Sequence, residues 1–344
     1  MRRRLTVLGI GILCLVVAVM TVWGTLFLWF SNIESEIVRG AMAGAFAIGT
    51  ILLFARVKLR RRALLAFAAV FAVLATSYFS IPPSHDRDWA PEFAVLPEAT
   101  VNGNLVEIRN IRNFEYRTET DFTPRYYDKT FDLDQLQGVD LVTVTWGSPA
   151  IAHIMTSFEF ADGQHLACSI EMRKERNEAG SMLSSMFRKF ELIYIMADER
   201  DVIRLRTHYR EPREKVRIYR TRIPVVDQRK LFLSYIDKVN ELARTPEWYN
   251  AIEDNCTTGV LERTHAYHGR GHYNWKVLFS GYVDEYAYEL GVIDTGKPFA
   301  ELRELSLVNP RAERADNAND FSVRIRKGLP RPAPFTLEEF EAPR

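Results

Sequence analysis

Three apolar runs in the first 81 residues constrain what this chain can fold into more than any other feature. They cover about residues 5–30, 37–55 and 63–81, and each is close to the roughly 20 residues that a helix needs to cross a bilayer. A cleavable signal peptide has one shorter apolar core. The sequence therefore predicts a three-helix membrane anchor over residues 1–81.

Basic residues in the short loops predict how this anchor is oriented. Three arginines precede the first run at positions 2–4, and five Lys or Arg residues stand at positions 56–62, between the second and third runs. Such residues mark the cytoplasmic side of a membrane. The loop "SNIESEIVR" (31–39) has two glutamates and one arginine. We therefore expect a multi-pass protein of the bacterial cytoplasmic (inner) membrane, with a cytoplasmic N-terminus and a periplasmic C-terminal domain.

The charge distribution argues against a nucleic-acid partner. The first 81 residues hold nine basic and two acidic residues, whereas the remaining chain holds 36 basic and 42 acidic residues. The part outside the membrane is therefore slightly acidic, and a surface that binds nucleic acid is basic.

Beyond the anchor, the sequence predicts an α+β domain. Prolines in "IPPSHDRDWAP" predict a linker over 82–100, residues 101–305 form the predicted domain, and the proline-rich end, 306–344, is expected to be a flexible tail. Period-two patterns in "LVEIRNIRNFEYR" and "VDLVTVTW" predict strands, and the charged run "DERDVIRLRTHYR" (198–210) is interpreted as a half-exposed strand. The stripe in "DQRKLFLSYIDKVNELAR" (227–244) predicts a helix.

A predicted hairpin brings a histidine opposite a glutamate. Strands "IAHIMTSFEF" (151–160) and "QHLACSIEMR" (164–173) are joined by a three-residue loop ending in Gly163, a residue suited to the left-handed position of such loops. The register then pairs residues whose numbers sum to 324. One face collects apolar residues and Cys168, and the other face pairs His153 with Glu171.

This pair has two interpretations. A carboxylate beside an imidazole fixes its tautomer and stabilises the imidazolium, as in a site with a nucleophile, a base and an orienting acid. Alternatively, His153 and Glu171 form an ordinary cross-strand ion pair at the surface.

The sequence "EDNCTTGV" (253–260) supplies the candidate nucleophile. Cap signals precede Cys256, and a helix is expected to follow and to end near Gly269. In a first helical turn, the N–H groups and the helix dipole lower a thiol pKa. The Cys256 amide, with Asn255 nearby, can supply oxyanion donors, and Ser157 is a second supporting residue. The alternatives are a buried, inert thiol and a Cys168–Cys256 disulfide.

Neither a metal nor an organic cofactor is expected. His265, His268 and His272 in "HAYHGRGH" lack an acidic or cysteine ligand at a matching spacing. Asp284, at the start of another predicted helix, is a possible addition to the site, although a carboxylate at a helix N-terminus is also an ordinary structural feature.

Several blocks of the sequence resemble one family. "HIMTSFEFADGQHLACSIEMRKE", "PEWYNAIEDNCTT" and "GYVDEYAYELG" occur in the same order as in the Lnb N-terminal periplasmic domain, and the resemblance covers about residues 105–295. It implies a papain-like (NlpC-type) thiol fold in permuted order, and lipoprotein N-acyl transfer by a Cys/His pair. The matching positions are Cys256, His153 and Glu171.

The function that the residues and the resemblance predict together is cysteine-dependent acyl transfer through a thioester. The expected substrates are a phospholipid ester and the N-terminal amine of a lipoprotein. One alternative is a cell-wall amidase or peptidase that uses the same Cys/His site, with water as the acceptor. Another is an envelope binding module without catalysis.

Overall fold

The computed structural model describes residues 2–56, 60–176, 178–268 and 271–336. The chain forms two compact units, one of Met1–His85 with Ala179–Glu191 and one of Asp86–Glu178 with Leu192–Arg344. The first unit, called here the helical unit, thus contains a short segment from the middle of the chain. The second is called the sheet unit.

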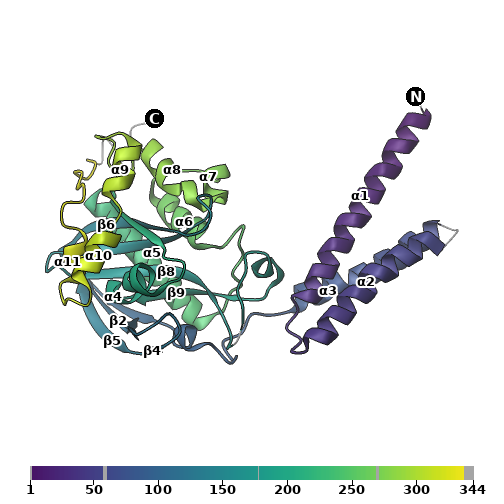
Figure 1. Ribbon diagram of the computed structural model, residues 1–344, viewed down its shortest axis with the longest axis horizontal. Helices are drawn as coiled ribbons and strands as arrows, with labels where there is room; N and C mark the ends of the chain where they lie inside the picture. Colours follow the sequence, from purple (N-terminus) through teal and green to yellow (C-terminus); the bar gives the residue numbers. More distant parts are fainter. Residues whose placement is uncertain (1, 57–59, 177, 269–270, 337–344) are drawn as a thin grey trace. The chain divides into compact units, whose positions relative to one another are not determined.

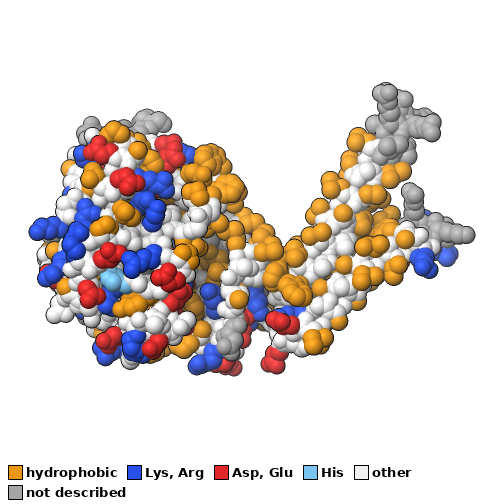
Figure 2. All heavy atoms as spheres, viewed as in Figure 1, with side chains coloured by type: hydrophobic (Ala, Val, Ile, Leu, Met, Phe, Trp, Pro, Cys, Tyr) orange, Lys and Arg blue, Asp and Glu red, His pale blue; other side chains and the backbone are white. Residues whose placement is uncertain are grey.

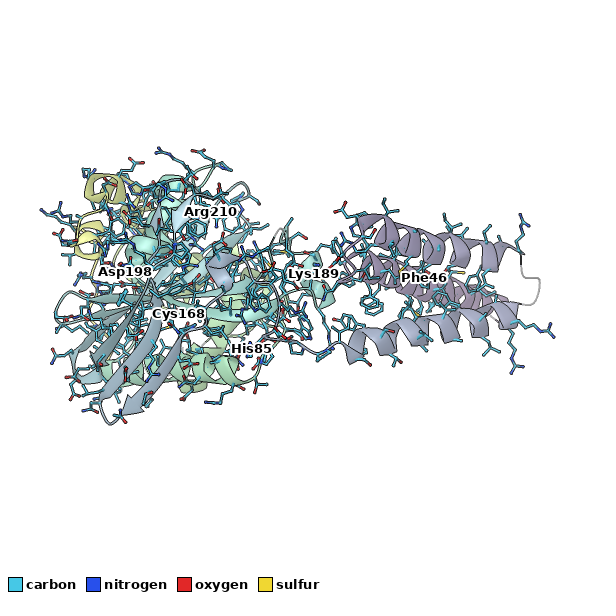
Figure 3. The ribbon with its side chains drawn as sticks, turned by 90° about the horizontal axis from the view of Figure 1, so that it is seen from below. Phe46, His85, Cys168, Lys189, Asp198 and Arg210 are labelled. Carbon is cyan, nitrogen blue, oxygen red and sulfur yellow. The ribbon has the colours of Figure 1, made fainter. Side chains whose placement is uncertain are left out.

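The helical unit contains α1 (Arg2–Trp29), α2 (Glu36–Arg56) and α3 (Arg60–Ser80). All three are long and apolar enough to cross a membrane, and hydrophobic side chains cover them (Figure 2). The prediction of three membrane helices is confirmed by length and composition. Phe46 of α2 lies among the helices (Figure 3), where a side chain at Gly24 of α1 would collide with its ring.

The sheet unit is built around an eight-stranded sheet (Figure 1). Its order is β1-β2-β9-β8-β7-β6-β10, with β5 paired to β2 outside this path, and β3 pairs with β4 separately. The strands are β1 (Glu98–Asn102), β2 (Leu105–Arg112), β3 (Glu115–Tyr116), β4 (Phe122–Thr123), β5 (Tyr126–Asp132), β6 (Leu136–Thr145), β7 (Ala152–Phe160), β8 (His165–Arg173), β9 (Glu191–Ala197) and β10 (Lys215–Arg220).

Helices cover both faces of this sheet, so both faces are apolar. On one face, β7 residues such as Ile154 and Phe158 pack with α5, α6 and α8. On the other face, Met155 packs with α4, α10 and α11. The helices of this unit are α4 (Glu199–Arg204), α5 (Val225–Arg244), α6 (Cys256–His268), α7 (Trp275–Leu278), α8 (Val283–Glu289), α9 (Phe299–Leu305), α10 (Asn309–Ala315) and α11 (Phe321–Ile325).

The mixed helix and sheet content agrees with the predicted α+β class, but the local prediction for residues 198–210 was wrong. Residues 198–210 form α4 and a π-helical turn, Leu205–Tyr209, instead of a strand. Asp198 caps α4 by accepting a hydrogen bond from the Arg200 amide, and Val202 and Ile203 are buried. The charged residues that alternate with apolar residues in this segment had suggested the two-residue period of a strand.

The predicted linker and tail are packed as well. Trp89 is buried, and the Arg173 guanidinium lies 4.1 Å from its ring centroid. Phe321 and Ile325 of α11 are fully buried, so 306–336 is not a flexible tail. The prolines there flank short helices whose apolar residues complete the second core.

Candidate active site

The β7–β8 hairpin has the predicted register. Met155 pairs with Ser169 and Phe158 with Leu166, so the paired numbers sum to 324. Gly163 ends the loop with φ +79°, a conformation that glycine adopts without strain. The register places His153 and Glu171 side by side, with His153 Nε2 3.1 Å from Glu171 Oε1.

Ser169 and Arg206 complete the surroundings of this pair. The Ser169 hydroxyl lies 2.7 Å from His153 Nε2 and donates to Glu171 Oε1 at 2.7 Å. Arg206, from the π-helical turn, donates to the same carboxylate oxygen at 3.0 Å. The side chain of His153 is only 11% exposed and that of Glu171 24% exposed, so the surface ion pair considered above does not describe them.

Cys256 is the first residue of α6, and Asn255 caps that helix. Asn255 Oδ1 accepts hydrogen bonds from the amides of Thr257 at 2.8 Å and Thr258 at 3.1 Å. The cap accepts hydrogen bonds from two of the backbone N–H groups that have no acceptor within the first helical turn. It therefore fixes the backbone that presents the thiol.

The thiol of Cys256 faces the histidine of the hairpin. The imidazole lies close enough to the thiol for each to shift the pKa of the other, and the Ile154 backbone N–H also favours the thiolate. Because His153 Nε2 is occupied by Ser169 and Glu171, Nδ1 is the ring nitrogen left for the thiol. Burial and the charges of Cys256 and Glu171 hold the pKa of the Tyr249 phenol well above its usual value, so this phenol lies near the nucleophile.

Electrostatics favour a charged Cys/His pair. Burial alone lowers the pKa of His153, but the charges of Glu171 and Cys256 outweigh it and raise this pKa to about 9. Burial raises the pKa of the Cys256 thiol, but His153 and the Ile154 amide outweigh it, so this pKa falls below its ordinary value. Burial likewise raises the pKa of Glu171, but His153, Arg206 and Ser169 hold it well below its usual range.

The sheet unit is similar to a known family. A model of the Lnb N-terminal periplasmic domain matches residues 122–281. This match confirms the resemblance found in the sequence, and it includes the hairpin and the start of α6. Comparisons with curated proteins and with solved structures gave no match.

Two supporting residues predicted for the Lnb domain have other partners. Ser157 lies on β7, but its hydroxyl donates to Glu199 at 2.6 Å, away from the thiol. The side-chain amide of Asn255 donates to the Ala251 carbonyl at 2.8 Å, so Asn255 acts as a helix cap and not as an oxyanion donor. Ser157 was misassigned because a buried strand gives no sign of which polar partner lies across the core.

The remaining sequence alternatives have clear outcomes. Cys168 and Cys256 both have free thiols, and Cys168 is buried among the strands (Figure 3). Asp284 binds the Tyr219 hydroxyl at 2.8 Å and Arg303 at 3.2 Å, so it does not join the site. The side chains of His265 and His268 lie outside the described residues, and His272 is exposed.

Sequence reasoning missed Ser169, Arg206 and Tyr249. Ser169 was visible, because the register places it two residues before Glu171 on the same face of β8. Arg206 was hidden within the charged run that was interpreted as a strand. Tyr249 reaches Cys256 through the turn in which Asn250 and Asp254 pair, and no local pattern marks such a turn.

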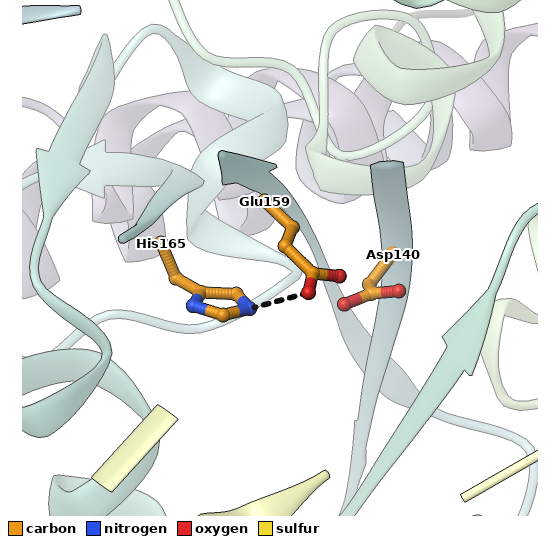
Figure 4. A group of neighbouring side chains, drawn as sticks. All are labelled: Asp140, Glu159 and His165. Carbon is orange, nitrogen blue, oxygen red and sulfur yellow. Dashed lines mark ion pairs between the residues drawn. The ribbon is translucent and has the colours of Figure 1, made fainter. Parts of the chain in front are cut away.

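A separate group, Asp140, Glu159 and His165, has the ligand types of a metal site (Figure 4). Arginines already neutralise its carboxylates. Arg326 binds Asp140 at 2.8 Å, and Arg220 contacts both acids. Burial and Arg326 also lower the pKa of His165. Bound guanidinium groups thus take the place that a cation would need, so this group fits a structural role in the sheet unit.

Proposed function

We propose that this protein is a membrane-anchored cysteine acyltransferase that acts through a thioester at Cys256. The observation that carries the proposal is the arrangement of three side chains: the Cys256 thiol interacts with the His153 imidazole, whose Nε2 lies 3.1 Å from Glu171 Oε1. A nucleophile, a base and an acid that orients the base are the parts that covalent acyl transfer requires. A permuted papain-like arrangement is the corresponding proposal for the fold.

In the first step, the Cys256 thiolate attacks the carbonyl carbon of a lipid ester. The C–O bond breaks, the leaving alkoxide takes a proton from the His153 imidazolium, and a thioester remains. The Cys256 amide lies where the oxyanion forms. The Tyr249 hydroxyl, which lies near the thiol, can donate a hydrogen bond to this oxyanion.

In the second step, an amine accepts the acyl group. Neutral His153 removes a proton from the amine as it attacks the thioester, an amide forms, and the thiolate leaves. The N-terminal amine of a lipoprotein is the proposed acceptor. Three apolar helices support this choice, because donor and acceptor would be embedded in the same bilayer as the enzyme. The proposed site faces the periplasm, in accord with the loop charges and the family match.

The test is to detect the intermediate. The full-length protein in phospholipid nanodiscs should carry an acyl group on Cys256 that hydroxylamine removes, as measured by mass spectrometry. Cys256→Ser and His153→Ala should abolish the thioester. Cys14→Ser, which alters a cysteine within α1, is the control and should leave it unchanged.

The acceptor is tested separately. Adding a synthetic lipopeptide with a free N-terminal amine should convert the thioester into an N-acylated peptide. If free fatty acid is the sole product, the protein is a thiol hydrolase. If no acyl group appears on Cys256 with any lipid ester, the proposed function is wrong.

A further inference from the structure

A cavity of about 100 Å³ lies between α6, α8 and the β6–β7 pair. Its walls are mostly aliphatic. They include Leu141, Ile154, Val260, Val283, Ala287 and Val292.

Apart from Thr257, the side-chain hydroxyl and carboxylate groups in the walls are hydrogen-bonded to protein, Asp140 to Arg326 and Tyr286 to the His272 carbonyl among them. Thr156 Oγ1 pairs with the Tyr235 hydroxyl at 2.8 Å. Thr221 Oγ1 donates to the Val139 carbonyl at 2.7 Å, and Thr264 Oγ1 to that of Val260 at 2.8 Å. An ordered water needs two to four polar partners, and an apolar cavity without them stays dry. The space therefore suits a hydrocarbon group better than water.

Two residues connect this cavity to the nucleophile. Ile154 lines the cavity and directly follows His153 on β7, and its amide favours the Cys256 thiolate. Thr257 lines it as well, and its hydroxyl oxygen is 4.0 Å from the sulfur. Any carbonyl carbon bonded to this sulfur would have its substituent close to these walls.

We propose that the cavity receives the hydrocarbon chain of the acyl group during transfer; this rests on the proposed function. An apolar cavity of 150 Å³ accommodates benzene, so the present cavity holds about four carbons by the same measure. The cavity thus holds only a short acyl chain. The carbons of a longer chain must extend out of the cavity, or the walls must move apart.

The experiment measures acylation of the full-length protein by p-nitrophenyl esters of graded chain length, from acetate to octanoate. The thiolate attacks the ester carbonyl, p-nitrophenolate leaves, and its burst reports one acyl group per Cys256. The rate constant of the wild-type protein should rise with chain length until the cavity is full and then stop rising.

Two substitutions should move this limit in opposite directions. Ala287→Leu fills the cavity and should shift the preference toward acetate, whereas Val283→Ala enlarges it and should favour longer chains. Ala300→Leu, at an exposed position of α9, is the matched control. Alkylation of Cys256 by iodoacetamide should be the same in all variants, because that reagent needs no cavity.

The outcomes separate the two proposals. If wild type and Cys256→Ala show the same absence of a burst, the acyl-transfer function itself is wrong. If the wild type gives a burst but both cavity variants keep its chain-length profile, the chain lies elsewhere and the cavity assignment is wrong. A change in one variant only, with iodoacetamide reactivity lost, would also overturn it, because the substitution would then act on the thiol.

A second, independent observation concerns Ala179–Glu191, the segment between β8 and β9 that belongs to the helical unit. Arg188 donates hydrogen bonds to the carbonyls of Tyr78, Phe79 and Ile81 at 3.0 to 3.2 Å. Carbonyls at a helix C-terminus lack partners within the helix, so Arg188 caps α3. Lys189 also donates to Asn32 Oδ1 at 3.3 Å, close to where α1 ends.

The segment also presents apolar side chains. Phe187 is buried against Phe30, with ring centroids 5.6 Å apart. Met182 is 57% exposed and Leu183 45% exposed, although both are next to a segment that packs on membrane helices. We infer that Met182 and Leu183 insert into the lipid at the membrane surface, as apolar side chains at a bilayer interface do.

This inference is tested by fluorescence quenching in phosphatidylcholine nanodiscs. Met182→Cys is labelled with bimane in full-length Cys14→Ser/Cys256→Ser protein, and Val323→Cys, at an exposed position of α11, is the control. Lipids brominated on their acyl chains should quench the label at 182 and not the label at 323. Equal quenching at both positions, or quenching at 182 by aqueous iodide alone, would overturn the inference.

Discussion

Replacing Glu171 with glutamine tests whether this carboxylate sets the charge of His153. The two side chains approach to 3.1 Å, and an opposite charge within 4–6 Å changes a pKa by about 1–3 units. We therefore expect the pKa of His153 to fall by about 1–3 units from its value of about 9. This equals about 1.4–4 kcal/mol of lost interaction with the imidazolium. Burial, which lowers the pKa, is unchanged, and Arg206 loses a carboxylate partner.

The same substitution changes how stability depends on pH. The His153 pKa in the folded protein, about 9, is above its unfolded value. The resulting stabilisation is complete below about pH 6.5 and is lost as the pH rises through about 9. In Glu171→Gln this loss should occur at lower pH. The Cys256 thiol should then titrate at higher pH, because the imidazolium that favours its thiolate is less populated.

The assay is NMR of histidine-labelled full-length protein in detergent micelles, with the His153 signal assigned from its absence in His153→Ala. Glu214→Gln is the matched control, because Glu214 also lies 3.7 Å from Arg206 but does not contact His153. The control should keep the pKa near that of the wild type. A pKa that remains near 9 in Glu171→Gln would refute the orienting role of Glu171.

Three further predictions concern groups around the site. Arg326→Met removes the guanidinium that binds buried Glu199 at 2.6 Å, while Asp140 keeps Arg220, and should cost about 3–5 kcal/mol of unfolding free energy; exposed Arg324→Met should cost less than about 0.5 kcal/mol in the same denaturation experiment. Tyr249→Phe should slow acylation by about 10²–10³-fold if the hydroxyl donates to the oxyanion, and leave iodoacetamide alkylation unchanged; equal acylation rates would exclude that role. Gly281→Ala places a methyl group against the Pro149 carbonyl and should cost about 1–3 kcal/mol in thermal unfolding; an unchanged melting temperature would contradict this.

The elements with strong periodic patterns could be predicted from the sequence. The three apolar runs have no other stable arrangement, because a long apolar helix needs a bilayer or a large core. The β7–β8 register followed from one turn and from the alternation of residues, since a slip of one residue would turn Phe158 to the opposite face of the sheet. This register brought His153 and Glu171 together. The helix start at Cys256 followed from its cap residues.

What could not be predicted depends on contacts between distant segments. The charged run at 198–210 folds as helical turns because the second face of the sheet needs a cover, and no local pattern shows that need. The segment 306–336 packs on that face for the same reason. Arg326, for example, meets Asp140 across 186 positions of the chain. The prediction that Ser157 supports the site failed for the same reason, because its partner Glu199 is brought near it only by the tertiary fold.

The contact between Cys256 and His153 depends on how closely α6 approaches the sheet. The helix and the hairpin are about 100 positions apart in the sequence, so neither local element sets their separation. Gly259, one turn into α6, faces β8 and β9, where a methyl group would lie 2.8 Å from Ile170 Cδ1 and 2.9 Å from the Tyr194 hydroxyl. A larger residue there would push the start of α6 away from the strands that carry His153 and Glu171. Because Gly259 has no side chain, α6 can approach the sheet closely. The distance between the Cys256 thiol and His153, on which the pKa of the thiol depends, therefore depends on this glycine.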